Sequence, residues 1–496
     1  MRQEQKQDLG CIRGRDSVRL KSRIVRIPRR EQCVVGGLAL LLVFTMWALG
    51  GARLWSQWIM GILSGVCFAA LFLPRSLFGG RWSRECTAGD RWRRLRRFPV
   101  FWLGLLFLSY IGLQGFNPAW KQVDNAQYHW LEPIPHIEWL PSGIATPFEE
   151  MNAFRVLLIM GGVWMAVCAL WAGVHHRRSL RFLFWVVCLN GAVGALTAVI
   201  LELRGVERVL GIVECDHRFL GPFLYVNHAA AFWNLCLSLS LGLFMYYQRR
   251  TRLTLAGSGP HMLFLLVGLI LLAGVLFSLS RLGIVLACCT VSAALLIGLF
   301  EFIKGIRKGT ILLSLIGVGI FGGLTWGLYR LVDVEAVERE YQSLWHSLRE
   351  FDGDRRRLLY EATYRMFRDR QWYGWGAGSF RFYFPVYQQD YPPLWQVDHQ
   401  RLFWSHAHND WLQYLAEYGI IGCALMGLMI LYIFGNMVIF CNNVRSLNLI
   451  SCLGFLFLAV HSMLDFVFQS PLILLTAALV LTGSAQLQKL DSRIKP

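Results

Sequence analysis

Apolar stretches long enough to cross a lipid bilayer recur along the whole chain, and they constrain its fold more than any other feature. A spanning helix needs about 20 mostly apolar residues, and such stretches lie at residues 33–53, 55–73, 99–116, 152–174, 181–203, 224–247, 261–279, 282–303, 309–329, 411–433, 448–468 and 471–487. Hydrophobic residues make up 55% of the 496 residues and charged residues only 16%, which excludes an ordinary soluble enzyme. The sequence therefore predicts an all-α polytopic membrane protein with about twelve transmembrane helices.

The distribution of basic residues indicates how the chain is oriented in the membrane. A formal net charge of +18 would suggest a nucleic-acid partner in a soluble protein, but here Lys and Arg gather in short segments such as residues 1–32 and 75–97. Alternate segments are poor in positive charge, and residues 117–150 hold one Lys against five acidic residues. Because Lys and Arg mark cytoplasmic loops, we predict that both termini are cytoplasmic and that nucleic acid is not a partner.

This topology divides the chain into four parts. They are a basic cytoplasmic tail (1–32), transmembrane helices 1–9 (33–330), a large extracytoplasmic loop (331–410), and transmembrane helices 10–12 with a short cytoplasmic tail (411–496). In the loop, apolar residues at helical spacing over residues 331–348 and 358–367 predict two amphipathic helices. An Asp-Gly-Asp sequence at residues 352–354 is expected to break the chain between them.

Polar residues at the outer ends of the spans form the candidate site. Arg218, Asn227, Arg281, His406 and His408 all fall there, and ionisable residues at the membrane are functional hypotheses because burying them is costly. The cytoplasmic side has no phosphate-binding loop or dinucleotide motif. An enzyme built this way needs an energy-rich donor presented outside, for which a lipid diphosphate is the natural candidate. Arg218 and Arg281 suit such a donor because a guanidinium binds two phosphate oxygens at once, although either could simply anchor the protein among lipid headgroups.

His408 is the best-placed candidate for a general base. Asn409 is a good N-cap for the helix at 411–433, so His408 sits over the positive end of that helix, which favours a neutral imidazole that can accept a proton. The alternatives are a hydrogen-bonded interfacial histidine, or a metal ligand together with His406. Two histidines without a nearby pair of carboxylates make a weak metal site, and most of the 13 cysteines lie in the apolar stretches, so we expect no metal.

Three further ionisable residues lie within the late spans. His461 and Asp465 are four residues apart and are expected to share one face of a helix, either as a proton relay or as a structural pair that holds helices together. Glu417, one turn into the helix at 411–433, is expected to be a hydrogen-bonded packing residue. The tryptophans of residues 117–150 could stack on sugars, but tryptophan at a membrane interface is common and needs no such role.

Five short motifs follow one another between residues 200 and 480. Residues 406–422 read HAHNDWLQYLAEYGIIG, residues 374–380 read GWGAGSF, residues 278–283 read SLSRLG, residues 461–466 read HSMLDF before Pro471, and Arg218 leads through Gly221-Pro222 to Asn227. In this order, and on the outer side, the set resembles the motifs of the O-antigen ligase and polymerase superfamily. The glycine-rich motif departs from the family pattern just before Gly374, where proline is usual, and this affects loop geometry more than chemistry.

The resemblance implies a metal-independent, inverting glycosyltransferase of the bacterial inner membrane that uses no cofactor. Its donor would be an undecaprenyl-diphosphate-linked glycan, and its acceptor a hydroxyl group on a lipid or glycan at the periplasmic face. His408 would deprotonate or orient that hydroxyl, and Arg218 and Arg281 would hold the diphosphate. We expect supporting roles for Asn227, His406, Glu417, His461 and Asp465.

The acceptor is not determined by these motifs. An O-antigen ligase, with lipid A–core as acceptor, is the reading we favour, and a polymerase or a protein O-oligosaccharyltransferase shares the same donor chemistry. A transporter or flippase is the alternative from another class, since about twelve helices are common there too. We find no paired inverted repeat in the sequence, and transport does not require a large loop that ends in a histidine motif.

Overall fold

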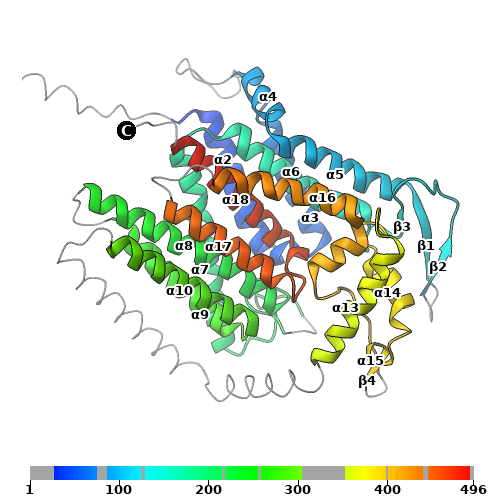
Figure 1. Ribbon diagram of the computed structural model, residues 1–496. Helices are drawn as coiled ribbons and strands as arrows, with labels where there is room; N and C mark the ends of the chain where they lie inside the picture. The colour runs from blue at the N-terminus through cyan, green and yellow to red at the C-terminus, as the bar shows by residue number, and fades with distance from the viewer. Residues whose placement is uncertain are drawn as a thin grey trace, which may run out of the picture.

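The computed structural model describes residues 27–74, 87–124, 129–214, 218–254, 259–303, 352–397, 400–438 and 445–491. Long helices lie side by side in one bundle (Figure 1). They are α2 (Arg29–Trp47), α3 (Leu54–Ala69), α5 (Pro99–Phe116), α6 (Ala153–Gly173), α7 (Arg177–Leu203), α8 (Val226–Thr254), α9 (His261–Phe277), α10 (Arg281–Ile303), α16 (Asp410–Val438), α17 (Arg445–His461) and α18 (Pro471–Asp491). The shorter helices are α4 (Ala88–Arg96), α13 (Asp352–Asp369), α14 (Phe380–Gln388) and α15 (Pro392–Trp395), with 3-10 turns at Leu49–Gly51 and Val467–Gln469.

The helical bundle confirms the predicted fold class. Among the described residues, eight helices are long and apolar enough to cross a membrane, and α3, α9 and most of α17 are shorter apolar helices. Large apolar side chains such as Ile62, Leu296 and Leu431 are more than 60% exposed on the outside of these helices, as expected where lipid is the solvent. The span predicted at residues 309–329 lies outside the described residues.

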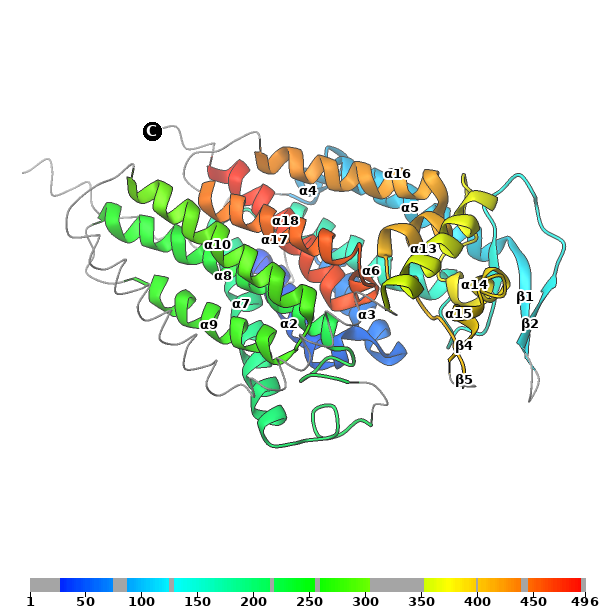
Figure 2. The same cartoon turned by 60° about the horizontal axis from the view of Figure 1, so that its bottom comes forward.

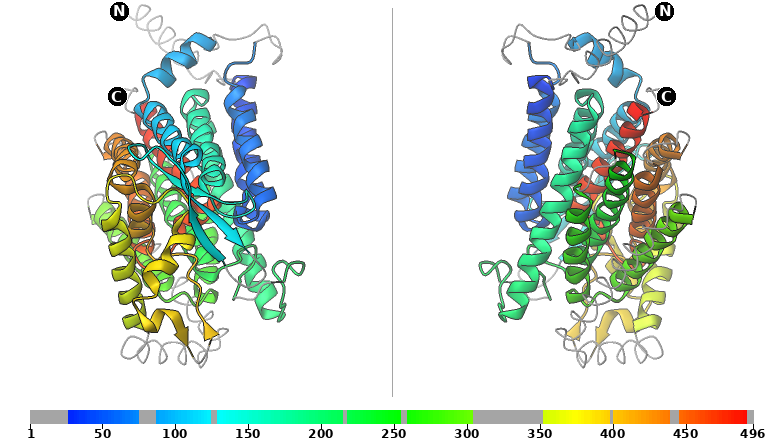
Figure 3. Two further views of the ribbon diagram at one scale, coloured as in Figure 1. Left: turned by 90° about the vertical axis from the view of Figure 1, so that its right-hand side faces the viewer. Right: turned by 90° about the vertical axis from the view of Figure 1, so that its left-hand side faces the viewer.

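The start of α2, the start of α7 and the end of α18 lie together at one end of the bundle, which we call the basic end. Glu31 on α2 is 3% exposed, and its carboxylate accepts hydrogen bonds from the His176 N–H at 3.0 Å and the Ser179 hydroxyl at 2.6 Å. Arg177 donates to the carbonyl oxygen of Leu490 at 2.6 Å. Helix α4 also lies toward this end, and α13 to α15 lie toward the opposite one, which we call the loop end (Figure 3).

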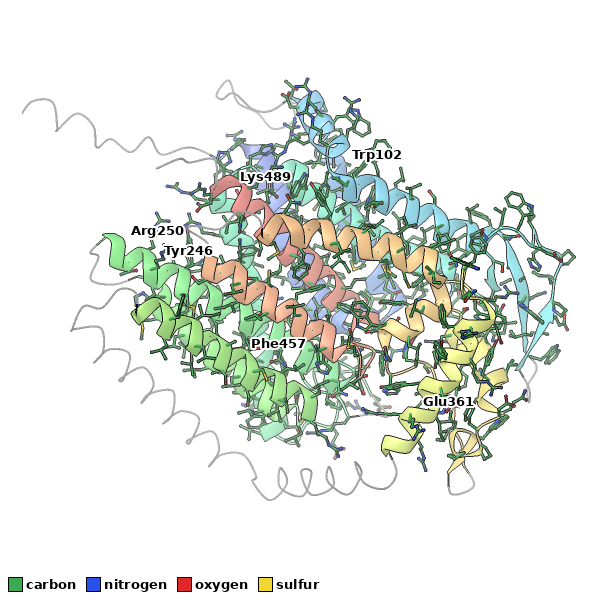
Figure 4. The ribbon with its side chains drawn as sticks, viewed as in Figure 1. Trp102, Tyr246, Arg250, Glu361, Phe457 and Lys489 are labelled. Carbon is green, nitrogen blue, oxygen red and sulfur yellow. The ribbon has the colours of Figure 1, made fainter. Side chains whose placement is uncertain are left out.

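Figure 4 shows the same separation with labelled side chains. Arg250 and Lys489 lie near the basic end, whereas Glu361 on α13 lies near the loop end. The helix α10 begins beside the first turns of α8, because Asn234 on α8 donates to the carbonyl oxygen of Gly283 at 2.8 Å. It therefore ends toward the basic end, whereas α13 lies at the loop end.

Helix α8 lies at the centre of the bundle and packs against α7, α9, α10 and α17. Its Trp233 is fully buried. Small residues permit the close approach: a Cβ at Gly454 of α17 would collide with the Ser238 side chain of α8. Such close packing of small residues is the main attraction available between helices in lipid, where burial from water contributes little.

A small sheet departs from the all-helical expectation. Strands β1 (Pro118–Asp124), β2 (His129–Pro133) and β3 (Gly143–Ala145) pair in the order β2–β1–β3, with β1 antiparallel to β2 and parallel to β3. Asn117 joins the sheet to the end of α5 by hydrogen bonds in both directions with the Ile137 backbone, at 3.0 and 2.8 Å. Trp130 and Trp139 in this region are 41% and 74% exposed.

The loop region contains the second of the two predicted amphipathic helices. This is α13, whose apolar face buries Leu359, Ala362 and Met366 completely. The Asp-Gly-Asp sequence does not break the chain as expected, because residues 352–354 form the first turn of α13. The first predicted helix, at residues 331–348, lies outside the described residues. Strands β4 (Gln396–Val397) and β5 (Gln400–Arg401) form a small hairpin after α15.

Candidate functional site

His408 lies at the loop end, immediately before α16, whose bent start lies beside α13 (Figure 2). Asn409 caps the helix as predicted, because its Oδ1 accepts a hydrogen bond from the Leu412 N–H at 3.0 Å. His408 itself has a φ of 49°, in the left-handed region that side chains with a Cβ seldom adopt. The Tyr360 hydroxyl on α13 donates to the His408 carbonyl oxygen at 2.9 Å. Neighbouring structure therefore holds His408 in a strained backbone conformation, which is typical of functional residues.

Asp465 faces the His408 imidazole. One carboxylate oxygen lies 3.6 Å from His408 Nδ1, which is longer than a direct hydrogen bond and corresponds to an electrostatic contact. The other oxygen accepts from the Tyr225 hydroxyl at 3.2 Å and from the Asn227 side-chain amide. Burial alone would raise the pKa of Asp465, but His408 and the N–H of Phe466 outweigh it and lower that pKa to about 2. Asp465 is therefore an ionised, almost fully buried carboxylate.

The predicted pairing of Asp465 with His461 along one helix is wrong in its geometry. Helix α17 ends at His461, and residues 462–464 form a turn that places Asp465 beyond the helix. The turn is fixed because the Ser462 carbonyl oxygen accepts from the Asp410 N–H of α16 at 2.8 Å. This bond docks the start of α16 on the end of α17, and the Asp465 carboxylate then meets His408. His461 remains buried beneath the site at 1% exposure.

Phe466 is the aromatic centre of the site. The His406 ring stacks on it with centroids 4.4 Å apart, and the rings of His408 and His228 meet its edge or face at 4.9 and 5.3 Å. Burial, followed by the charge of Arg381, lowers the pKa of His406 to about 3. His406 is therefore a neutral packing partner at physiological pH. It lies two residues before His408, which contacts the ionised Asp465.

A buried hydrogen-bond network joins the glycine-rich motif to the histidine loop. The Glu417 carboxylate, on a residue 2% exposed, accepts from the backbone N–H groups of Gly378 at 3.1 Å and Phe380 at 3.2 Å. Gln413 donates to the same carboxylate at 3.1 Å, and its own oxygen accepts from the Ala407 N–H at 3.1 Å. Because Ala407 lies between the two histidines, this network positions the loop that carries His408. Glu417 thus binds the glycine-rich motif directly and the histidine loop through Gln413.

Helix α16 is interrupted at Gly419, whose φ of 62° and ψ of −171° are open almost only to glycine. The backbone N–H groups of the glycine-rich motif fill the gap, since Trp375 donates to Ala416 O and Gly376 to Glu417 O, both at 2.9 Å. A Cβ at Gly419 would collide with the carbonyl oxygen of Trp372. The glycine-rich motif and the end of the histidine motif, separate in the sequence, therefore form one structural unit.

The two predicted phosphate-binding arginines are placed differently. Arg281 is the first residue of α10, at the loop end beside the first turns of α8, and thus on the side of the bundle where Asn227 approaches Asp465. Arg218 is exposed, and its guanidinium lies 4.0 Å from the Glu202 carboxylate at the end of α7. The structure therefore joins Asn227 and His408 to Asp465 directly and adds His406 through Phe466, whereas the Arg218 contact with Glu202 lies outside this group.

Sequence reasoning missed the aromatic residues of the site. Phe466 is the last residue of the motif HSMLDF, and Tyr225 lies two residues before Asn227, so their positions in or beside the motifs were the available signal. Tyr360 gave no signal beyond its place in an amphipathic helix. In the parts of the chain that the structure describes, no three His, Cys, Asp or Glu side chains converge as metal ligands. The contact with Asp465 leaves His408 with one ring nitrogen facing a carboxylate and the other available to accept a proton.

Comparison with protein families supports the resemblance. The family model described as O-antigen ligase matches residues 264–427, a segment that contains Arg281, the glycine-rich motif and His408. No curated protein matches the sequence. The match confirms the resemblance drawn from the motifs and supports glycosyl transfer of the O-antigen ligase and polymerase class. Together with the apolar helices, it supports a multi-pass protein of a bacterial inner membrane.

Proposed function

Starting from the O-antigen ligase match, we propose that this protein transfers a glycan from an undecaprenyl-diphosphate-linked donor to a hydroxyl group at the periplasmic face. Lipid A–core is the proposed acceptor. The observation that carries the proposal is the contact between His408 and the ionised Asp465, at the start of a capped helix and at the end of the bundle opposite α4. This is the arrangement expected of a general base whose conjugate acid is stabilised by a carboxylate.

The proposed reaction is a single displacement. His408 Nε2 takes the proton of the acceptor hydroxyl while that oxygen attacks the anomeric carbon of the donor sugar. The glycosidic bond forms as the bond from this carbon to the diphosphate oxygen breaks, and the diphosphate leaves with the electron pair. Attack from the face opposite the leaving group inverts the anomeric configuration. Asp465 stabilises the imidazolium until its proton passes to solvent.

The leaving diphosphate gains negative charge as the bond breaks, and fixed cations in a partly desolvated site stabilise that charge most. We assign this role to Arg281, which begins α10 at the loop end, and to Arg218, which precedes α8 in the chain. The family resemblance implies that no metal ion takes part. Asn227, bound to the Asp465 carboxylate, keeps that group oriented toward His408.

Replacing His408 tests the proposal. His408→Ala should lower the transfer rate about 10²–10⁴-fold in purified membranes supplied with lipid-linked donor and lipid A–core, while membrane abundance stays unchanged. His406→Phe is the matched control, because it keeps an aromatic ring on Phe466, and it should retain substantial activity. Transfer by His408→Ala at the wild-type rate would rule out the base. Loss of activity in both variants, reversed by a divalent cation, would indicate a metal site instead.

A further inference from the structure

Helix α13 carries three consecutive arginines, Arg355 to Arg357, in its first turns. Arg356 lies four residues before Tyr360, so the two side chains share one face of the helix. Tyr360 is the residue whose hydroxyl binds the His408 carbonyl oxygen at 2.9 Å. The same face of α13 therefore brings Arg356 to the histidine loop, and Arg357, one position further round the helix, faces another way.

Arg356 lies close to a second group of the site. Burial raises the pKa of the Tyr225 hydroxyl and Asp465 raises it further, while the positive charge of Arg356 opposes both. Tyr225 in turn donates to the Asp465 carboxylate at 3.2 Å. Arg356 thus lies close enough to both Tyr225 and Tyr360 for its positive charge to act on their hydroxyl groups.

The Arg356 side chain is exposed, and it makes no hydrogen bond or ion pair with the residues whose side chains the structure describes. Asp465, the nearby carboxylate, already contacts His408, Tyr225 and Asn227. By contrast Arg381, the other arginine near the histidines, has the Glu150 carboxylate at 3.8 Å. An exposed arginine beside a proposed glycosyl-transfer site, where a diphosphate is the leaving group, is suited to bind an anionic part of the substrate.

We propose that Arg356 binds the diphosphate of the donor from the loop side, in addition to Arg281 and Arg218. The inference rests on the proposed function, since it assigns the diphosphate a third ligand. It gives α13 a direct part in the site: the helix that holds the His408 backbone through Tyr360 also contributes a cation to the leaving group. Substrate binding and the placement of the base are then coupled through one helix.

Binding of undecaprenyl diphosphate to the purified full-length chain in detergent micelles tests this proposal without turnover. Arg356→Ala should weaken binding about tenfold or more, as expected for the loss of a charged hydrogen bond. Arg356→Lys should recover only part of the loss, because lysine cannot bind two oxygens at once. Arg357→Ala removes the same charge one position away and should change binding less than about twofold.

The outcomes separate this inference from the proposed function. If the wild-type protein binds the diphosphate and Arg356→Ala binds it equally well, Arg356 is not a ligand and the proposed donor stands. Equal weakening by Arg356→Ala and Arg357→Ala would indicate general attraction by charge and would also overturn the assignment. If the wild-type protein does not bind the diphosphate, both proposals fail. The thermal midpoint of each variant is measured alongside, and Arg356→Gln, which keeps most of the side chain, replaces the alanine variant if its midpoint falls.

Discussion

The Asp465 carboxylate is the charged neighbour of the His408 imidazole. Asp465 is ionised because its pKa is lowered to about 2 from an ordinary value of 3.8. A carboxyl whose pKa is depressed by folding stabilises the native state above its ordinary pKa, and this stabilisation is lost as the pH falls from 3.8 toward 2. Between pH 5 and 8 Asp465 therefore stays charged and can stabilise a protonated His408 throughout.

Asp465→Asn separates this electrostatic role from packing. Asparagine has nearly the same shape, so the fold and donor binding should persist, but the proton-accepting step loses its counter-charge. We expect kcat to fall by about 100-fold or more with little change in KM for the donor. Glu214→Gln, which removes an acid from an exposed outer position with a 79% exposed side chain, serves as the control. Unchanged kcat in Asp465→Asn would contradict the assigned role.

At the scale of elements, the break in α16 is the feature that organises the loop end. In a continuous helix, Gly419 and its neighbours would make the regular backbone hydrogen bonds. The carbonyl groups of α16 would then all be occupied, and the glycine-rich motif could not bind them. The break exposes the Ala416 and Glu417 carbonyl oxygens, and Trp375 and Gly376 occupy them. The Glu417 side chain then reaches the same motif through Gly378. One irregular turn thus fixes the loop against the membrane helices.

Gly419→Ala should destabilise this junction. The backbone conformation at Gly419 costs a residue with a Cβ about 1–3 kcal/mol, and the added atom meets the Trp372 carbonyl. We expect a lower thermal midpoint in detergent and reduced transfer activity. Gly427→Ala, on the same helix and with nothing within 4 Å of the added Cβ, should leave the midpoint unchanged or raise it slightly, because alanine favours helix. Equal behaviour of the two variants would show that the break is not required.

At the scale of the whole molecule, the bundle has two chemically different ends. Helix α4, with Arg93, Arg94 and Arg96 in its last turn, and the buried Glu31–His176 contact lie at the basic end. The helices α13 to α15 and the His408 cluster lie at the loop end (Figure 3). If the basic end is cytoplasmic, every residue of the proposed site faces the periplasm.

Reporter fusions test this orientation. A reporter joined after Arg97, at the end of α4, should be active only in the cytoplasm, and one joined at Asp390, between α14 and α15, only in the periplasm. The physical reason is that arginines resist transfer across the membrane during insertion. Full-length protein with a reporter at each terminus should report the cytoplasm in both cases. A periplasmic signal from the α4 fusion would remove the placement on which the proposed function depends.

Local properties of the sequence determined the membrane class, the approximate positions of the helices, and the end of the bundle where polar residues gather. The hydropathy of a span and the N-cap at Asn409 depend on residues that are close together in the sequence, so the helices they specify can be predicted from the sequence. The family motifs added His408 as the candidate base. The same local reasoning did not predict the strands β1 to β3, because their pairing joins residues that the sequence alone does not bring together.

Only the tertiary structure decided which side chains meet at the site. Tyr225 and Asp465 are 240 positions apart, and no local pattern relates them. His461 is closer to Asp465 in sequence, yet the turn after α17 directs the carboxylate to His408. Arg356 acquires its proposed role only because α13 docks through Tyr360 onto the histidine loop. The chain determines each helix through short-range hydropathy and capping, whereas the contacts of a site depend on how distant helices pack, and packing is a property of the whole bundle.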